Sequence, residues 1–397
     1  MKSPKRVLDS EEGESERQHV VHLTTVHHPQ DPRISHKQLP TLQEAGFEVT
    51  LIATGRPADR SSGLETILLP PAETRLERLR RQASAYREAR SLDADVYQVH
   101  DPELLPLLFW LRRSTGAATV YDMHEDYRSK GPVLGRVLRA LERWAFRWLD
   151  HVLLAEESYR SILEEELVSS TQVLNYFKPV VQAEGTDGGA NVQGPSRLVY
   201  TGTVSRERGL TTMLGVGAEA QRQSWNGEVR IVGRCHRPSQ WKTAQQRQQD
   251  EAPETIALIG GDTYVPKSKM ATHHRWADVG LALFLPHSNY QKSMPTKFYE
   301  YLYYGLPIIC SDFPLWRDFV EMHECGVVVP PDDPEAVLDV LSRWQAEPGR
   351  YRSYVENARA AASQYRWAQI KEPLLSVYRE LCPEHEESGS GCTTESP

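Results

Sequence analysis

Residues 277–312, ADVGLALFLPHSNYQKSMPTKFYEYLYYGLPIICSD, decide the fold that this sequence predicts. The apolar run 279–285 has the length and composition of a strand buried on both faces. Pro295 then stands at the start of a helix, a position that suits its fixed φ and its missing N–H group. Gly305 ends that helix, and 307–310 predicts the next buried strand. Strand, loop, helix and strand in this order are typical of a parallel α/β sheet.

One face of the predicted helix is polar, with Ser293, Lys297, Glu300 and Tyr304 on it. Helix N-termini in such sheets lie at the carboxyl edge of the strands, and their free N–H groups attract anions, to which Lys297 adds a full charge. Glu300 is placed to accept hydrogen bonds from sugar or ribose hydroxyls. The face therefore favours a nucleoside diphosphate that carries a sugar. The alternative is a solvated face on which Lys297 and Glu300 pair with each other.

The overall composition is that of a globular protein. With 397 residues the chain is long enough for two domains, and 39% hydrophobic and 25% charged residues are ordinary values. A net charge of −8 argues against a general nucleic-acid binder. The five scattered cysteines lack metal-ligand spacing, which fits a reducing compartment. Since neither a secretory signal nor an apolar window of ~20 residues is visible, we expect a cytoplasmic protein, peripheral at most on the inner face of the cell membrane.

Strand and helix patterns alternate on both sides of a glycine-rich stretch, which predicts two doubly wound, parallel-sheet α/β domains facing a cleft. The expected boundaries are a disordered start at 1–17, a first domain at 18–181, a linker at 182–196, a second domain at 197–366, a helix at 367–382 crossing back to the first domain, and a disordered tail at 383–397. Strands are predicted at 19–25, 47–53, 95–100, 118–122, 151–155, 197–200, 229–232, 255–258, 279–285, 307–310 and 326–329.

Three loops rich in histidine and charge follow strands of the first domain, at the edge where ligands of parallel sheets gather. From them we take the acceptor-side candidates Asp31, Arg33, Asp101, His124 and Glu125. A metal site is the tempting alternative, but the spacings match no familiar ligand pattern, so we expect no metal and no cofactor. The other alternative is that His100 and His124 cap strand ends through backbone hydrogen bonds.

A further loop, 202–209, lies between a strand and a helix of the second domain. Its backbone N–H groups and an arginine are suited to phosphate, and its candidates are Gly202, Thr203, Arg206 and Arg208. The loop is neither a G-x-G-x-x-G fingerprint nor a Walker loop, which counts against NAD-binding and ATP-hydrolysing proteins.

Residues 132–149 predict a basic amphipathic helix. Val133, Val137, Leu141, Trp144, Trp148 and Leu149 form its apolar face, and Arg136, Arg139, Arg143 and Arg147 line another. One interpretation is a peripheral membrane contact at an anionic bilayer surface. The other is an ordinary helix whose apolar stripe packs on the sheet, which the apolar face alone favours about two to one.

Taken together, residues 19–381 resemble glycosyltransferase family 4, retaining enzymes of the GT-B fold. The first-half likeness lies in DPRISHKQLPTLQEAGFEVTLIA, VYQVHDPELLPL and VYDMHEDY. The second-half likeness lies in YTGTVSRERGL, RIVG, SMPTKFYEYLYYGLPIICSD and CGVVVPPDDPEAV. The resemblance implies a nucleotide sugar held mainly by the second domain and an acceptor held by the first. It also implies a hexosyltransferase of polysaccharide or cell-envelope glycan biosynthesis, with a glycan or lipid-linked acceptor.

The resemblance assigns roles to individual residues. Arg208 falls on the phosphate-binding cation that precedes glycine, Glu300 on the second glutamate of a paired motif that contacts the donor ribose, and His100 on a histidine near donor and acceptor. With Lys297, Arg208 and His100 are the catalytic candidates. The leaving diphosphate is then stabilised by cations and a helix N-terminus without a metal. The donor-binding candidates are Gly202, Thr203, Arg206, Ser293, Pro295, Thr296 and Glu300.

Two positions depart from the family pattern. Lys292 stands where the first glutamate of the pair is expected, and Thr203 stands where many members have a second arginine. These departures keep two alternatives open: a non-catalytic scaffold that binds a nucleotide sugar within a glycan-assembly complex, and a GT-B epimerase that changes the nucleotide sugar without an acceptor.

Overall fold

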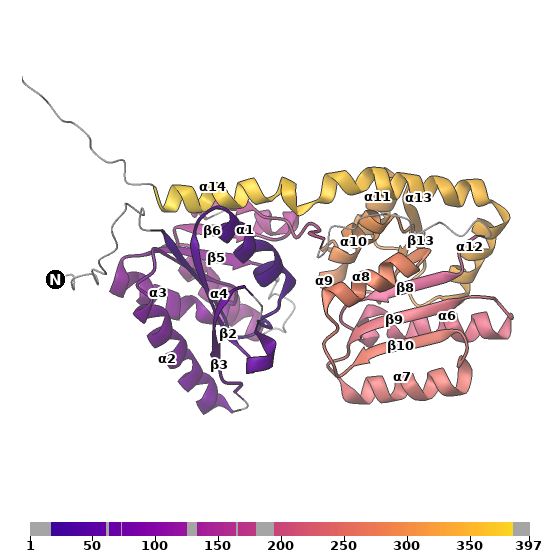
Figure 1. Cartoon of the computed structure of the whole chain (residues 1–397), viewed down its shortest axis with the longest axis horizontal. Helices are drawn as coiled ribbons and strands as arrows, with labels where there is room; N and C mark the ends of the chain where they lie inside the picture. The colour runs from indigo at the N-terminus through magenta and orange to yellow at the C-terminus, as the bar shows by residue number, and fades with distance from the viewer. Residues whose placement is uncertain are drawn as a thin grey trace, which may run out of the picture.

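A computed structural model describes residues 17–60, 63–72, 74–124, 133–163, 166–179 and 194–383. Each half of the chain forms a parallel sheet covered by helices, and the two domains stand side by side (Figure 1). The architecture of two Rossmann-like domains agrees with the predicted fold class. The disordered ends and most of the linker expected from the sequence lie outside the described residues.

The first domain is built on a seven-stranded parallel sheet. Its spatial order is β3 (Glu65–Leu69), β2 (Glu48–Thr54), β1 (His19–Thr24), β4 (Val96–Val99), β5 (Ala118–Met123), β6 (His151–Leu154) and β7 (Ser170–Gln172). One face packs against α1 (Leu39–Glu44), which continues a π-helical turn at Pro32–Gln38, and against α14 (Lys371–Leu381). The other face carries α2 (Arg75–Ser91), α3 (Leu105–Thr115) and α4 (Leu134–Ala145); a short α5 (Arg160–Leu163) follows β6.

The second domain is built on a six-stranded parallel sheet. Its order is β10 (Ile256–Gly261), β9 (Glu228–Arg234), β8 (Arg197–Thr201), β11 (Val279–Ala282), β12 (Ile308–Ser311) and β13 (Gly326–Val329). Because the crossovers are right-handed, α6 (Leu210–Arg222), α7 (Pro238–Glu251) and α12 (Pro334–Ala346) share one face. The opposite face holds α8 (Lys267–Trp276), α10 (Thr296–Tyr304) and α11 (Pro314–Met322), with the short α9 (Ser288–Gln291) beside α11.

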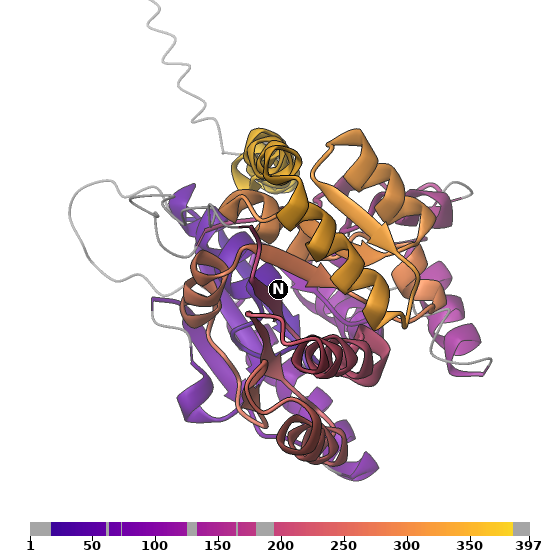
Figure 2. The ribbon, with the colours of Figure 1, turned by 90° about the vertical axis from the view of Figure 1, so that its right-hand side faces the viewer.

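A C-terminal arm joins the domains. It consists of α13 (Pro348–Ala362) on the second domain and α14 on the first, and Figure 2 shows it nearly end-on along one side of the molecule. The segment between α13 and α14, which returns to the first domain, pairs with Phe177. The Phe177 N–H donates to the Tyr365 carbonyl at 3.0 Å, and the Trp367 N–H donates to the Phe177 carbonyl at 2.8 Å. The Trp367 indole then donates to Thr41 of α1 at 2.8 Å.

The structure departs from the predicted elements in a few places. The strands β3 and β7 were not predicted. In the case of β7 the reason is that its three residues are polar and carry no hydrophobic pattern. The predicted strand at 279–285 ends at Ala282, because Leu283 and Phe284 leave the sheet as a buried loop at 1% and 2% exposure. Pro295 caps α10 instead of belonging to it. Apolar runs therefore predict burial more reliably than they predict pairing.

Candidate functional site

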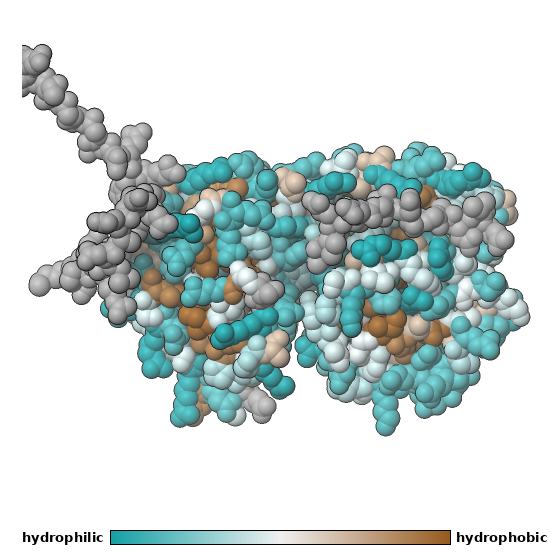
Figure 3. Space-filling view, in the orientation of Figure 1, coloured by the Kyte–Doolittle hydropathy of each residue, from teal (hydrophilic) through white to brown (hydrophobic). Residues whose placement is uncertain are grey.

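The carboxyl edges of the two sheets face each other across a furrow, visible between the domains in Figure 3. Loops that follow strands make the contacts across it. The His28 ring stacks on Tyr264 with centroids 5.2 Å apart, and the Glu156 carboxylate accepts from Met294 N–H at 3.4 Å. Because ligands of parallel sheets bind at these edges, the furrow is the candidate site.

Arg208 reaches the furrow from the short 3₁₀ turn Arg206–Arg208 after β8. The turn is held by Ser205, whose hydroxyl accepts from Arg208 N–H at 3.3 Å. Gly209 follows at φ +84°, and a Cβ there would stand 1.8 Å from the Leu283 carbonyl oxygen. Only glycine permits this approach, which brings the arginine beside the loop after β11. The guanidinium carbon lies 5.7 Å from the Phe284 ring centre.

Lys297 lies in the first turn of α10 and points to the same ring. Its ammonium is 4.7 Å from the Phe284 centroid and 4.9 Å from that of Tyr200, and the residue is 5% exposed. Among the described residues, no carboxylate lies within 4.0 Å of this ammonium. Burial, and then the charge of Arg208, lower the pKa of Lys297 to about 7. Two cations therefore converge at a helix N-terminus, and no carboxylate of the described residues forms an ion pair with Lys297, a geometry suited to a bound anion.

Glu300 is buried one turn further along α10, and its partner differs from both interpretations of the sequence. It pairs with Lys267, the first residue of α8, and not with Lys297. His274 Nε2 stands 3.8 Å from its other oxygen. Burial raises the pKa of Glu300, but the Lys267 ammonium outweighs burial and lowers that pKa to about 2. In this conformation the carboxylate holds α8 against α10, and its expected contact with a ribose remains a prediction.

Acid should test this pair. The pKa of Glu300 is lowered relative to the unfolded chain, so the pair stabilises the fold above pH ~4.5 and this contribution disappears as the pH falls toward ~2. We expect Glu300→Gln to reduce the free energy of unfolding by about 3 kcal/mol at pH 6 and to have little effect near pH 2.5, measured by urea unfolding. An equal loss at both pH values would show that the charge of Glu300 does not matter.

The remaining donor-side candidates lie in the loop after β8 and at the start of α10. Gly202 follows β8, and Pro295 and Thr296 form the start of α10. The Thr203 carbonyl accepts from the Tyr200 hydroxyl at 2.6 Å, and the Ser293 hydroxyl donates to the Asn289 carbonyl at 2.8 Å. Arg206 and Lys292 are exposed, so neither supplies a buried charge beside Arg208.

In the first domain, Asp122 is the centre of a buried polar network. Arg33 forms a two-pronged ion pair with it, with nitrogen–oxygen distances of 2.9 and 2.6 Å, and Gln38 donates to it at 3.0 Å. His100 Nδ1 lies 3.0 Å from Asp122, and His100 Nε2 lies 3.0 Å from His22 Nδ1. Although burial raises the pKa of Asp122, Arg33 and His100 hold it well below its usual range.

Three of the sequence candidates lie inside the fold. His100 and Asp101 are 0% exposed and Arg33 is 3% exposed, so these side chains do not line the furrow in the described conformation. His100 does not cap a strand through a backbone hydrogen bond either, because both of its ring nitrogens face side chains. Position along the chain indicated the sheet edge at which these residues lie but not the depth of each side chain.

Closer to the furrow, His124 pairs with His27, a residue that the sequence did not single out. Their Nε2 atoms are 2.9 Å apart, and His27 Nδ1 lies 3.8 Å from Asp31. Asp101 fixes the loop after β1, because its carboxylate accepts from Thr25 N–H at 2.6 Å. Glu125 lies outside the described residues.

A metal ion fits this region poorly. His100, Asp122 and His124 each offer a donor atom within 4.8 Å of the others. Both oxygens of Asp122, however, already accept hydrogen bonds from the Arg33 guanidinium, which a metal cation would have to displace. The group is best described as a satisfied hydrogen-bond network.

Two further lysines, which the sequence analysis missed, add positive charge between the domains. Lys37 donates to the Asn175 carbonyl at 3.1 Å, and burial followed by the charge of Lys267 lowers the pKa of Lys37 to about 7. Lys267 follows Pro266 at a helix start, as Lys297 follows Pro295 and Thr296. That repeated proline–lysine pattern at the start of a helix was the available signal for Lys267.

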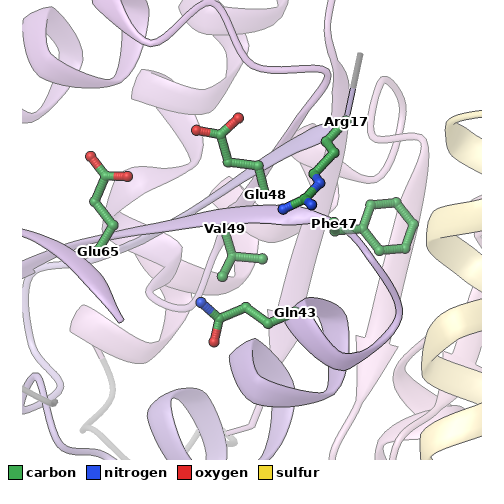
Figure 4. A pocket seen from close by; sticks show the side chains of 6 residues that line it. All are labelled: Arg17, Gln43, Phe47, Glu48, Val49 and Glu65. Carbon is green, nitrogen blue, oxygen red and sulfur yellow. The ribbon is translucent and has the colours of Figure 1, made fainter. Parts of the chain in front are cut away.

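An open pocket elsewhere on the first domain is not part of the furrow. It lies at the amino ends of β2 and β3, the opposite edge of the sheet from the loops described above (Figure 4). Its lining residues are Arg17, Gln43, Phe47, Glu48, Val49 and Glu65.

Comparisons with family models match both halves of the chain. Residues 16–174 match the glycosyl transferase 4-like domain, and residues 188–361 match the glycosyl transferases group 1 domain. Among curated proteins, no sequence matches the chain.

Solved structures share the fold at low sequence identity. Sucrose-phosphate synthase from Thermosynechococcus elongatus has a TM-score of 0.73 and 16% identity over 92% of this chain and 99% of that one. Anabaena HepE in complex with UDP and glucose has a TM-score of 0.71 and 12% identity over 92% and 100%. An E. coli structure titled trehalose-6-phosphate, bound with UDP-2-fluoro glucose, has a TM-score of 0.64 and 11% identity over 91% and 99%.

Proposed function

We propose that this protein moves a hexose from a nucleoside-diphosphate sugar to a glycan or lipid-linked acceptor with retention of configuration. The premise is that the chain belongs to the glycosyltransferases that combine a 4-like first domain with a group 1 second domain. The observation that carries the proposal is the pair of cations, Arg208 and Lys297, which share the Phe284 ring, with no carboxylate of the described residues paired to Lys297. Several structural neighbours hold UDP or UDP-glucose, which supports a nucleotide-sugar donor.

In the proposed reaction the difficult step is departure of the diphosphate. Negative charge grows on the β-phosphate as the bond to the sugar breaks, and Arg208, Lys297 and the N–H groups of α10 stabilise that charge without a metal. These groups are fixed in the fold before the substrate arrives, so they need little reorganisation during the reaction. The leaving phosphate accepts the proton of the acceptor hydroxyl as the new bond forms on the same face of the sugar.

On the acceptor side, we assign roles to the first-domain residues according to how deeply each of them is buried. His124 and His27 lie in the loops that follow β5 and β1, and we assign them the contacts with donor and acceptor hydroxyls. His100 is kept as a positioning residue, since its nitrogens hold Asp122 and His22. The pathway proposed is polysaccharide or cell-envelope glycan synthesis in the cytoplasm.

Donor binding should depend on pH through Lys297. Its pKa of about 7 means that the free protein loses this charge as the pH rises, whereas a bound diphosphate favours the charged form. We expect affinity for UDP-glucose to fall by up to about tenfold per pH unit above pH 7, measured by calorimetric titration. UDP-glucose is a suitable probe because its phosphates do not titrate near neutral pH. A pH dependence that persists unchanged in Lys297→Met would assign the proton to another group.

The enzymatic proposal is tested by what the purified protein does with a nucleotide sugar. A panel of nucleotide sugars is first screened by thermal shift, because a ligand of the native state raises the melting temperature. The selected donor is then incubated with and without glycan acceptors while nucleotide release is followed. Release that depends on an acceptor supports the transferase. Binding without release would indicate a scaffold, and a changed sugar still attached to its nucleotide would indicate an epimerase.

A further inference from the structure

The first domain exposes an unusual number of large apolar side chains on one helical layer. Ten such side chains are at least 38% exposed in the described part of the chain, and six of them lie on three adjacent helices. They are Leu76 and Leu79 of α2 at 58% and 65%, Trp110 of α3 at 61%, and Val133, Leu134 and Val137 at the start of α4 at 69%, 52% and 58%. We call these six residues the apolar rim. Figure 3 shows apolar residues gathered in the area where Figure 1 labels these helices.

The apolar rim does not belong to the core of the domain. The second half of the apolar stripe on α4 is satisfied, because Trp144 and Trp148 pack on Phe109 of α3 with centroids 5.2 and 5.3 Å apart. The first half of the same stripe, Val133 and Val137, has no such cover among the described residues. Both interpretations of this helix are therefore partly realised: one half packs on the domain, and the other half faces outward.

Among the described residues, the exposed charged side chains of α4 and its following turn are all arginines. Arg136, Arg139, Arg143 and Arg147 of α4 and its following turn are all exposed. The one carboxylate of α4, Glu142, is 4% exposed and accepts from the Tyr121 hydroxyl at 2.8 Å, so it does not neutralise the outer face. Arg143 pairs with Glu166 at 3.4 Å, and Arg139 and Arg147 form no ion pair with a carboxylate in the described part of the chain. In a chain with a net charge of −8, this is a local concentration of the opposite sign.

The apolar rim also lies beside the furrow. Val133 caps α4, and Leu76, Leu79, Leu134 and Val137 lie within the first five residues of α2 or α4; both helices follow strands, so these ends lie at the carboxyl edge of the sheet. The guanidinium of Arg81 in α2 interacts electrostatically with Glu103 and Asp101, which places this part of the helix near the loop after β4. A surface pressed against the rim would therefore stand next to the acceptor side of the furrow.

We propose that the apolar rim and the arginines of α4 dock the protein on an anionic lipid bilayer. Apolar side chains beside exposed arginines suit an interface that offers both acyl chains and negative headgroups. A water-exposed patch of this kind is unusual in a monomeric protein. None of the described helices has the length and hydropathy to cross a bilayer, so the contact is peripheral. The function of the contact, presenting a lipid-linked acceptor to the furrow, rests on the proposed transferase reaction.

Vesicle flotation tests the docking without any need for catalysis. We expect the full chain to float with vesicles of phosphatidylcholine and phosphatidylglycerol, to bind pure phosphatidylcholine at least tenfold less, and to be released by salt. Arg139→Gln with Arg147→Gln should lower partition by roughly fivefold per arginine, and Val133→Ser with Val137→Ser should lower it by about tenfold or more. Met322→Ser, which removes an apolar side chain that is 74% exposed on α11, is the matched control and should retain binding.

Three results would overturn the docking proposal. They are equal partition to charged and neutral vesicles, unchanged partition in both double variants, and a stable dimer that is lost in Val133→Ser with Val137→Ser. Circular dichroism confirms that each variant is folded. UDP-glucose binding is measured in parallel: variants that lose vesicles but keep the nucleotide separate the two proposals, and a protein that binds vesicles but no nucleotide would contradict only the transferase.

Discussion

Lys297→Met is expected to abolish most of the activity while making the protein more stable. The ammonium of Lys297 is buried against two aromatic rings and has no carboxylate partner among the described residues, so keeping it charged costs the folded protein free energy. Methionine has a similar length and removes that penalty, and we expect the melting temperature to rise. Turnover should fall by about 10²–10³-fold, because a group that stabilises the departing diphosphate is lost.

Arg208→Met should show the same loss of turnover, and Lys269→Met is the matched control. Lys269 is an exposed lysine of α8 at the same edge of the sheet. The Lys269→Met variant should therefore keep the turnover and the melting temperature of the wild type. Turnover and thermal unfolding are measured on the same preparations. If Lys297→Met melts earlier than the wild type and loses activity in proportion, Lys297 is a structural residue and the proposed role is wrong.

Asp122→Asn is expected to have the opposite signature, a large loss of stability. Asparagine keeps the shape of the side chain but leaves the Arg33 guanidinium, which is 3% exposed, without its counter-charge. Breaking one partner of a buried ion pair typically costs about 3–5 kcal/mol of unfolding free energy. The same change disturbs His100 and Gln38, which share that carboxylate. Chemical denaturation at pH 7 measures the effect.

The control for this prediction is an exposed ion pair. Asp312 pairs with Arg317 on the surface of the second domain, with side chains 31% and 47% exposed. Asp312→Asn should therefore cost less than about 1 kcal/mol. Similar losses for both variants would mean that the buried network contributes no more than a surface pair. The two predictions together distinguish residues that act on the substrate from residues that hold the fold.

Much of the architecture could be predicted from the sequence, because it depends on local patterns. The run 279–285, Pro295 and Gly305 predicted a strand–loop–helix–strand unit, and the structure contains β11, α10 and β12 in that order. Such features are visible in sequence because one residue type satisfies a backbone requirement that others cannot. The close approach of Gly209 to the Leu283 carbonyl, by contrast, became visible only in the structure.

The partners of the site residues could not be predicted, because they come from distant parts of the chain. Glu300 pairs with Lys267, 33 positions earlier, and not with its helical neighbour Lys297. Arg33 lies 89 positions from Asp122, and the pair is buried although the loop that carries Arg33 was predicted to lie at a ligand-binding edge. Periodicity shows which face of an element carries a residue, but it does not show which distant charge lies opposite that residue. That distant charge decides whether the residue is available to bind a ligand or is used to stabilise the fold.

The central claim is that Arg208 and Lys297 form a preorganised site for a diphosphate. Calorimetric titration of UDP-glucose into the wild type and Lys297→Met at pH 6.5 tests it most directly. We predict measurable binding by the wild type and a loss of at least about tenfold in affinity in the variant, with the fold intact. Equal affinity in the two proteins would contradict the claim.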